Sequence, residues 1–375
     1  MKIKTITCHD VYNYGASLQA YALMKYLQNQ EHEVEIIDYK PEYLCGRYNF
    51  WHINPESKYY NLCKKNKFVH FLYGIKNLKD TFRTFKRKKK FDLFKKEYLS
   101  VTSNAYHSNE ELKNNIPDAD LYIAGSDQIW NTSSCNGKDP TFYLDFIQDK
   151  AKKATYAASF GISQIQEEWR SFVKAMIQNI GHVSVREETG LKILEDLGLN
   201  GEVVLDPVFL LDKKEWTNLI CNQYSEKYLL VYDFLHNDSE LETLAITIAR
   251  KNNWKIYSIN DYNPIGYANK NISNAGPIEF LEYINSAQMI ISSSFHATAF
   301  SILLNKEFYV FKLKGYTNSS RITDLLSKLN ILNRFITKKQ DSSMQEIKYQ
   351  EVNAILIKER SKSYQYFSEV YSSIY

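Results

Sequence analysis

"KIKTITCHDVYNYGASLQAYALMKYLQNQEHEVEIIDY", residues 2–39, changes its hydrophobic period twice. Residues 2–7 (KIKTIT) are rich in β-branched side chains and predict a strand. After a turn around YNYGAS, the segment LQAYALMKYLQNQ places apolar residues at helical spacing, and VEIIDY predicts a second strand. A strand–helix–strand opening favours an α/β fold, in which a parallel sheet is covered by helices.

The alternation of strands and helices recurs along the chain and restarts after the segment LNGEVVLDPVFLL. We therefore expect two Rossmann-like domains that meet near residue 205, since 375 residues are long for one core. The N-terminal domain spans residues 1–204 and includes an irregular excursion at 40–118 that is rich in aromatics and lysines. The C-terminal domain spans 205–344. Residues 345–375 predict a helix that packs back on the N-terminal domain.

The composition is that of an ordinary globular protein, with 44% hydrophobic and 24% charged residues. A net charge of +4 gives no reason to expect a nucleic-acid partner. The 29 tyrosines suit a surface that faces sugars, but the codon usage of an AT-rich genome would also raise their number. The N-terminus has no signal-peptide pattern and no apolar run approaches a membrane span, which favours a cytoplasmic protein.

The cysteines have no metal-ligand spacing, so the sequence predicts no metal site. The turn DVYNYGASL lacks a GxGxxG spacing, so no dinucleotide cofactor is expected either. Free thiols in a reducing cytoplasm are the simplest interpretation. There are five of them, Cys8, Cys45, Cys63, Cys135 and Cys221.

The segment RTFKRKKKFDLFKKEYL (residues 83–99) is the densest basic run. Four phenylalanines are interleaved with its charges or precede them directly: Phe82, Phe85, Phe91 and Phe94. One interpretation is a solvated helix whose phenylalanines face the core. The other is a surface that touches anionic lipid headgroups or a nucleic acid, and hence a peripheral contact with the inner face of the membrane.

Ligands of open α/β sheets bind beyond the carboxyl ends of the strands, where helix N-termini favour anions. Two turns at such ends carry polar side chains. In DVYNYGASLQAYAL, Gly15 lets the backbone approach a ligand and Ser17 is a candidate helix cap beside Asn13. In AGSDQIWN the polar group consists of Gly125, Ser126, Asp127 and Gln128, followed by Trp130 as a candidate sugar platform or as core.

Two further turns carry a cation or an ionisable ring. Arg186 in SVREE follows a short strand and opens a helix, so it predicts either a bidentate anion site or a salt bridge to Glu187 or Glu188. His296 lies in SSSFHATAFSILLNKEF, where a strand gives way to an apolar helix. It is either a cap or a general acid, because an unperturbed pKa of about 6.5 allows both protonation states.

Taken together, these segments resemble the polysaccharide pyruvyl transferase family along nearly the whole chain. The matching residues are NYGASLQAYAL, AGSDQIWN, SVRE, LDPVFLL, SSSFHATAFSILLNKEF and SSRITDLL. The resemblance implies a fold similar to GT-B glycosyltransferases, with the active site in the cleft between two domains. It also implies transfer of a pyruvyl unit from phosphoenolpyruvate to a sugar or lipid-linked oligosaccharide, as a ketal and without a metal.

Carried over by motif, the resemblance makes His296 the general acid and Arg186 an anion-binding residue. Many relatives have arginine where this chain has Ser294, so a positive charge expected near the phosphate is either missing or supplied by Lys312, Lys314 or Arg321. Asp127 or Asp10 is the candidate base for the sugar hydroxyl.

Two other functions remain open at this point. A nucleotide-sugar glycosyltransferase would share the architecture but bind a nucleotide. A glycan-binding relative that has lost catalysis would bind saccharide without releasing phosphate, and Ser294 makes this conceivable.

Overall fold

We analysed a computed structural model of the chain. It describes residues 1–45, 66, 78–233, 238–260, 264–313, 319–337 and 346–374, with the side chains of residues 78–84 outside the description. Of the residues singled out by the sequence, Cys63, Phe82 and Lys314 fall outside these described side chains.

The first half of the chain builds a parallel sheet with the strand order β3-β2-β1-β4-β5. Its strands are β1 (Lys2–Ile6), β2 (Glu33–Tyr39), β3 (Val101–Tyr106), β4 (Leu121–Ala124) and β5 (Lys153–Thr155). Beyond β5, single bridges lead to the parallel pair β6 (Ser184–Val185) and β7 (Glu202–Val203). Alternate residues of β1 face two different apolar cores, Ile3 one and Ile6 the other, as period-two side-chain placement requires.

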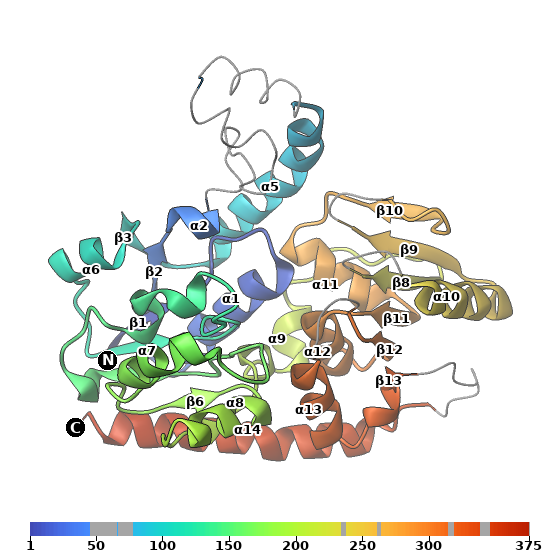
Figure 1. Ribbon diagram of the computed structural model, residues 1–375. Helices are drawn as coiled ribbons and strands as arrows, with labels where there is room; N and C mark the ends of the chain where they lie inside the picture. Colours follow the sequence, from blue (N-terminus) through green and yellow to red (C-terminus); the bar gives the residue numbers. More distant parts are fainter. Residues whose placement is uncertain are drawn as a thin grey trace.

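The helices of this half lie around that sheet (Figure 1). They are α1 (Tyr14–Asn29), α2 (Glu42–Cys45), α5 (Leu78–Tyr98), α6 (Asn109–Asn114), α7 (Glu167–Ile177), α8 (Glu188–Asp196) and α9 (Lys213–Thr217). The short 3-10 helices are η2 (Asn136–Lys138), η3 (Pro140–Tyr143), η4 (Lys150–Lys152) and η5 (Pro207–Phe209).

The second half builds a six-stranded parallel sheet, β10-β9-β8-β11-β12-β13. Its strands are β8 (Tyr228–Tyr232), β9 (Lys255–Ile259), β10 (Lys270–Ile272), β11 (Met289–Ser292), β12 (Glu307–Phe311) and β13 (Phe335–Ile336). Its helices are α10 (Ser239–Asn252), α11 (Pro277–Ser286), α12 (Phe295–Leu303), α13 (Ser320–Lys328) and α14 (Tyr349–Ser372), with η6 (Leu332–Arg334). On β8, Leu229 packs in the core under α10, while Leu230 belongs to the core with α11 and α12. Helices therefore cover both faces.

Helix α1 is buried on most of its sides. This explains why its apolar residues are found around most of the helix and not only along one stripe. It packs on the first sheet and also contacts α11, α12 and η5. Tyr14 in its first turn stacks on Phe280 of α11, with ring centroids 4.6 Å apart and planes 4° apart. The N-terminal end of α1, where strand β1 leads into the helix, is therefore fixed against the second half.

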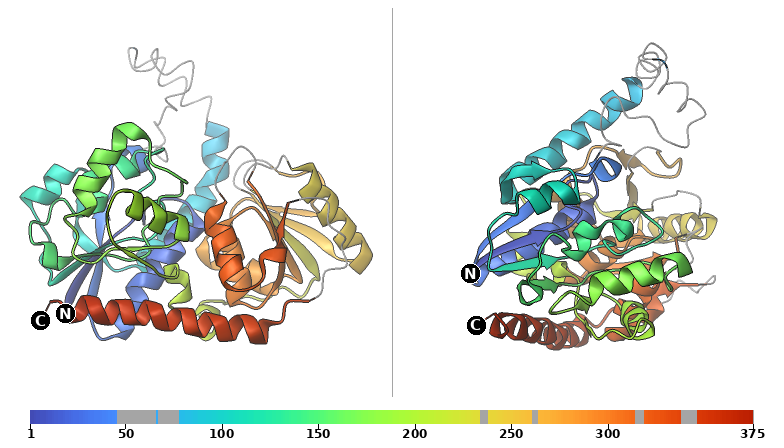
Figure 2. Two further views of the ribbon diagram at one scale, coloured as in Figure 1. Left: turned by 60° about the horizontal axis from the view of Figure 1, so that its bottom comes forward. Right: turned by 60° about the vertical axis from the view of Figure 1, so that its left-hand side comes forward.

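Helix α14 crosses from the second half to the first along one side of the molecule (Figure 2). Near its start, the hydroxyl of Tyr349 donates to the carbonyl of Ser301 in α12 at 3.3 Å. Two turns before its end, the hydroxyl of Tyr366 donates to the carbonyl of Thr155 in β5 at 2.6 Å. Helix α14 thus contacts a strand of the first sheet and a helix that covers the second sheet.

The predicted α/β class with Rossmann-like sheets is confirmed. The expected irregular excursion at 40–118 is wrong in part, because its described residues include α2, α5, α6 and strand β3, which pairs with β2. The sequence of β3 (VTSNAY) is short and polar and lacks the apolar alternation by which a strand is recognised. An edge strand needs little such alternation. The exact boundary near residue 205 stays a prediction.

Candidate active site

Arg186 occupies the turn between β6 and α8, beyond the carboxyl end of the strand. Its side chain is only 2% exposed, and its Nη1 donates to Asp206 Oδ2 at 2.6 Å. Its Nη2 lies 3.6 Å from Asp127 Oδ1, and its Nε lies 3.7 Å from Glu187 Oε2. A buried guanidinium is therefore surrounded by three carboxylates, each from a different turn of the first half.

The charges of this cluster stabilise one another. Burial alone would lower the pKa of Arg186, but the carboxylates of Asp206, Asp127 and Glu187 raise it above its ordinary value. Burial would raise the pKa of Asp206, yet the neighbouring His296 and Arg186 hold it far below its usual range. Arg186 and Asp206 are consequently an ion pair at neutral pH.

His296 joins this cluster from the second half of the chain. It lies in the first turn of α12, whose N-cap Ser294 accepts from the backbone of Ala297 at 3.4 Å. The ring Nε2 is 3.6 Å from Asp206 Oδ2, an ion-pair separation that exceeds hydrogen-bond distance. Asp206 therefore faces both Arg186 and the ring.

Gly15 in the first turn of α1 lies directly against the same ring. A Cβ atom built on this glycine would be 1.9 Å from His296 Nδ1, far inside van der Waals contact. The backbone at Gly15 is thus closely approached, as predicted, but the group that approaches it is the ring of His296. Only a residue without a side chain lets α1 and α12 meet here.

Several buried polar atoms of the cluster have no hydrogen-bond partner among the described residues. They are Nε and Nη2 of Arg186, Nε2 of His296 and Oε2 of Glu187. The other oxygen of Glu187 is satisfied, because it accepts from Ser159 Oγ at 2.8 Å and from the backbone of Phe160 at 3.2 Å. Unsatisfied buried donors are costly, and a bound anion would satisfy those of Arg186 and His296.

A second guanidinium also lies near Phe295. Arg186 Cζ is 4.7 Å from the centre of this ring, and Arg321 Cζ, from α13, is 5.9 Å from it. Burial and the charge of Arg186 lower the pKa of Arg321 to about 10, so it remains cationic at neutral pH. With its amide oxygen turned toward Arg321, Gln128 accepts from Nη1 at 3.2 Å and from Nη2 at 3.1 Å.

Comparison with known proteins identifies the family. The profile of polysaccharide pyruvyl transferases matches residues 13–314, which include all the residues of the cluster except Arg321. The chain belongs to the polysaccharide pyruvyl transferase family. No curated protein matches the sequence.

The solved structures similar to this pyruvyl transferase family member share its fold at very low sequence identity. A putative UDP-N-acetylglucosamine 2-epimerase from Listeria monocytogenes is 8% identical, with a TM-score of 0.53 over 98% of this chain and 89% of that chain. The UDP co-structure of MnaA from S. aureus is 9% identical, with a TM-score of 0.51 over 100% of this chain and 90% of that chain. These similarities support the predicted GT-B-like arrangement of two Rossmann-like domains.

Three residues predicted to bind substrate in this family member are structural instead. Trp130 is completely buried, stacks on Tyr143 and donates from Nε1 to a backbone carbonyl at 3.1 Å, so it is core and no sugar platform. Ser126 is also fully buried and donates to the carbonyl of Ala157 at 2.6 Å. Ser17 is buried inside α1, and the N-cap is Asn13, which accepts from the backbone of Ala16 at 3.1 Å.

The turn after β4 nevertheless delivers Asp127 and Gln128 to the cluster. Gly125 has a φ of 132°, and a Cβ on it would lie 2.1 Å from the carbonyl oxygen of Tyr156. Asp127 follows with a φ of 71°, a left-handed conformation that is uncommon outside glycine. Glycine at 125 thus permits the sharp turn that directs the Asp127 carboxylate toward Arg186.

The other two candidates lie apart from the Arg186–His296 cluster in the described contacts. Asp10 pairs with Lys95 at 3.0 Å and with Lys40 at 3.6 Å, which makes it a weak candidate for a base. Lys312 directly follows β12 and is exposed, and no described contact joins it to Arg186 or His296. Of the proposed replacements for the missing arginine, the structure places Arg321 at the cluster.

Sequence reasoning missed Asp206 and Phe295, whereas the ion pair of Arg186 with Glu187 is one of its two alternatives for Arg186. The segment LDPVFLL contained the signal for Asp206, an aspartate between an apolar run and a proline. Within the described part of the chain, no group of three or more His, Cys, Asp or Glu residues is arranged to hold a metal ion. No described helix combines the length and apolarity needed to cross a membrane.

Proposed function

We propose that the protein transfers a pyruvyl group from phosphoenolpyruvate to a sugar of a cell-surface polysaccharide or its lipid-linked precursor, forming a ketal across two hydroxyls. One observation carries the proposal. Asp206 holds Arg186 at 2.6 Å and faces His296 at 3.6 Å, so a fixed anion-binding group and a proton-carrying ring lie side by side. Family membership supplies the reaction class.

The donor carries a phosphate and a carboxylate, and the site offers two guanidinium groups, both near the ring of Phe295. Arg186 is the more rigid of the two because it is buried and paired with Asp206. Its unsatisfied Nε and Nη2 are suited to bidentate binding of one anionic group. Arg321 binds the other group and replaces the charge that Ser294 lacks.

The first chemical step adds a sugar hydroxyl to the donor. His296 gives a proton to the methylene carbon, which becomes a methyl group, while the hydroxyl oxygen forms a bond to the adjacent carbon. Asp127, whose side chain is 20% exposed, accepts the hydroxyl proton. The carboxylate of Asp206 lies 3.6 Å from His296 Nε2 and helps to position the ring for the transfer.

The second step closes the ketal. The bond between carbon and the phosphate oxygen breaks, and a second hydroxyl of the same sugar adds to the same carbon. The proton of this hydroxyl restores His296, and the proton held by Asp127 leaves with the inorganic phosphate. Phosphoenolpyruvate and a sugar diol thus become a pyruvate ketal and phosphate. The guanidinium groups stabilise the leaving phosphate electrostatically.

The test measures phosphate release from phosphoenolpyruvate against a panel of pyranosides, with the ketal identified by mass spectrometry. Arg186→Lys keeps the charge but loses the bidentate fork, so the apparent donor constant should rise at least tenfold. Exposed Arg250→Lys is the matched control and should not change it. Calorimetric binding of a nucleotide sugar, with no phosphate release from any acceptor, would instead favour a glycosyltransferase.

A further inference from the structure

The inner face of the basic helix α5 is part of the protein core. Phe91 and Phe94 are 4% and 3% exposed, and Arg87 is 4% exposed. Arg87 donates to the backbone carbonyl of Tyr12 at 2.7 Å, and its guanidinium lies 5.1 Å from the centre of the Tyr14 ring. For this face, the structural interpretation of the basic run is correct.

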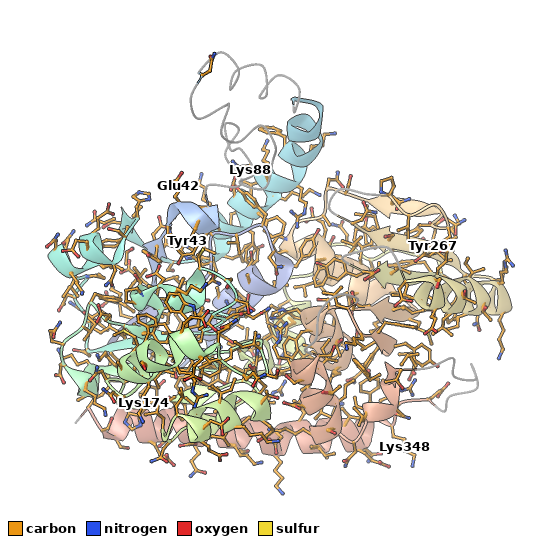
Figure 3. The ribbon with its side chains drawn as sticks, viewed as in Figure 1. Glu42, Tyr43, Lys88, Lys174, Tyr267 and Lys348 are labelled. Atoms are coloured by element: carbon orange, nitrogen blue, oxygen red, sulfur yellow. The ribbon has the colours of Figure 1, made fainter. Side chains whose placement is uncertain are left out.

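The lysines on the two flanks of α5 also have partners within the protein. Lys90 pairs with Glu279 of α11 at 2.5 Å, and Lys95 pairs with Asp10 at 3.0 Å. Lys88, labelled in Figure 3, lies 5.7 Å from the centre of the Tyr12 ring. These residues attach the helix and are not available to bind another molecule.

The remaining face of α5 points to solvent and combines apolar and cationic side chains. Phe85 is 59% exposed and Leu93 is 41% exposed. At the helical rotation of roughly 100° per residue they share an arc of about 100° with exposed Lys86, Lys89 and Lys96. None of these three lysines has a partner among the described residues. We call these five residues the outer face of α5. Exposed Asp92 borders it on one side and exposed Glu97 on the other, and Asp92 accepts a hydrogen bond from the hydroxyl of Tyr12.

The inner face of α5 is linked to the candidate active site through the first turn of α1. On its inner side the helix contacts Tyr14, whose ring is 5.2 Å from that of Phe91. Tyr14 precedes Gly15, and Gly15 lies against His296. Figure 1 shows α5 rising from the body of the molecule above α1 and α11. A surface bound to the outer face would therefore be separated from this end of α1 only by the helix α5 itself.

We propose that the outer face of α5 docks the protein on an anionic lipid surface. The lysines meet headgroup phosphates, and Phe85 and Leu93 enter the boundary between headgroups and acyl chains, as in amphipathic helices that lie in a membrane interface. Charge complementarity selects this occupant over an uncharged protein surface. If the proposed function holds, docking brings the donor site to a lipid-linked acceptor.

The test is co-sedimentation of the full chain with vesicles, without donor or acceptor, so that the result does not depend on the proposed reaction. Vesicles of phosphatidylcholine with about one-third phosphatidylglycerol should retain the protein at low salt, and pure phosphatidylcholine should not. Since each lysine near such a surface is worth roughly a fivefold change in binding, a variant with Lys86, Lys89 and Lys96 changed to Gln should bind roughly 100-fold more weakly.

The matched control removes three exposed lysines from other helices, Lys192, Lys251 and Lys358, by the same change to Gln. It should bind the anionic vesicles as the wild type does, whereas Phe85→Ser with Leu93→Ser should weaken binding. Retention unaffected by the outer-face variants, or equal loss in the control, would overturn the proposal. So would binding to an RNA homopolymer without binding to vesicles. Phosphate release with a soluble pyranoside should be the same in all these variants.

Discussion

Asp206 lies between two of the side chains from which the candidate site is built. Its carboxylate is completely buried and accepts from Arg186 on one side, while the His296 ring lies on the other. Its second oxygen accepts from the backbone of Val208 at 3.0 Å. A carboxylate with this many partners keeps its charge, and it fixes the relative position of a guanidinium and an imidazole that come from different halves of the chain.

Replacing this carboxylate should lower stability. Asp206→Asn leaves Arg186 buried beside Asp127 and Glu187 without its closest counter-charge, and breaking a buried pair costs about 3–5 kcal/mol. Urea denaturation at pH 7 should show this loss. Asp118→Asn is the control, since that side chain is 86% exposed and should contribute less than about 1 kcal/mol. A change below about 1 kcal/mol for Asp206→Asn would mean that the pair contributes little to folding.

His296→Gln separates proton transfer from anion binding. Glutamine is polar and similar in reach, so the fold should persist, and turnover should fall by about 10²–10⁴-fold, the usual contribution of general acid–base catalysis. Donor affinity should change much less, because Arg186 and Arg321 remain. The exposed His107→Gln serves as control. If the His296→Gln protein turned over at the wild-type rate, the histidine would be no more than a residue of the helix N-terminus.

At the scale of residues, sequence reasoning named two side chains that the structure brings together, Arg186 and His296, but not the carboxylate that holds them. Arg186 and His296 were predictable because each follows a strand and begins a helix. The role of Asp206 was not predictable, because it depends on two contacts that a local pattern does not show. One is with Arg186, 20 residues away in the chain, and the other is with His296 in the second half. Trp130 was misjudged as a candidate platform for the same reason: only the fold shows that Tyr143 covers it.

At the scale of elements, the carboxyl ends of β1 and β2 hold a second buried charge network. His9 Nε2 lies 2.9 Å from Asp38 Oδ1, and Lys40 donates to Asp38 Oδ2 at 2.6 Å. Lys40 also reaches Asp10, which Lys95 of α5 binds. The network ties α5 to the sheet, so it fixes the helix whose outer face we propose to dock on lipid.

The pH dependence of this network follows from Asp38. Burial would raise the pKa of Asp38, but hydrogen bonds from His9 and Lys40 lower it to about 2, below the value of about 3.9 in an unfolded chain. The folded-state pKa is depressed, so the stabilisation is fully present above about pH 4 and is lost as the pH falls toward 2. At pH 7 it amounts to about 2 kcal/mol.

Asp38→Asn should therefore lower the free energy of unfolding by about 2 kcal/mol at pH 7, and the difference from wild type should shrink between pH 4 and 2. Denaturation curves of both proteins across this range measure it, with exposed Asp118→Asn as the reference for a surface carboxylate. A difference that stayed constant down to pH 2 would show that the ionised state of Asp38 is not what stabilises the network.

The elements that sequence reasoning found are those with a clear pattern of their own, such as α1 and β2. It missed β7, β10 and β13, which have two or three residues each and pair at the margins of their sheets. Such strands form because a neighbouring strand offers unpaired backbone N–H and C=O groups. Their own sequence therefore need not show a strand pattern. The four turns that carry the candidate site were predictable because the strands before them are long enough to recognise or are followed by clear helices.

At the scale of the whole molecule, the two halves meet through packing that includes the candidate site. Tyr14 of α1 stacks on Phe280 and donates to the carbonyl of Ala275 at 3.2 Å. One residue later, Gly15 lies against His296. Together with α14, these contacts couple the relative position of the halves to the position of the ring (Figure 2). No local pattern in the sequence could have shown this coupling.

Gly15→Ala tests that coupling. In an isolated helix the change would stabilise by about 0.5–1 kcal/mol, but here the new Cβ would lie 1.9 Å from the His296 ring, so the ring or α1 must move. A displacement of about 1 Å can cost about 100-fold in rate, and we expect a loss of turnover of that order with a stability loss of about 1–3 kcal/mol. Gly266→Ala is the matched control, since a Cβ there meets nothing within 4 Å. Phosphate-release kinetics and urea denaturation of both variants measure the effects. A Gly15→Ala protein that was more stable than wild type and fully active would show that α1 and α12 are not held against each other at this point.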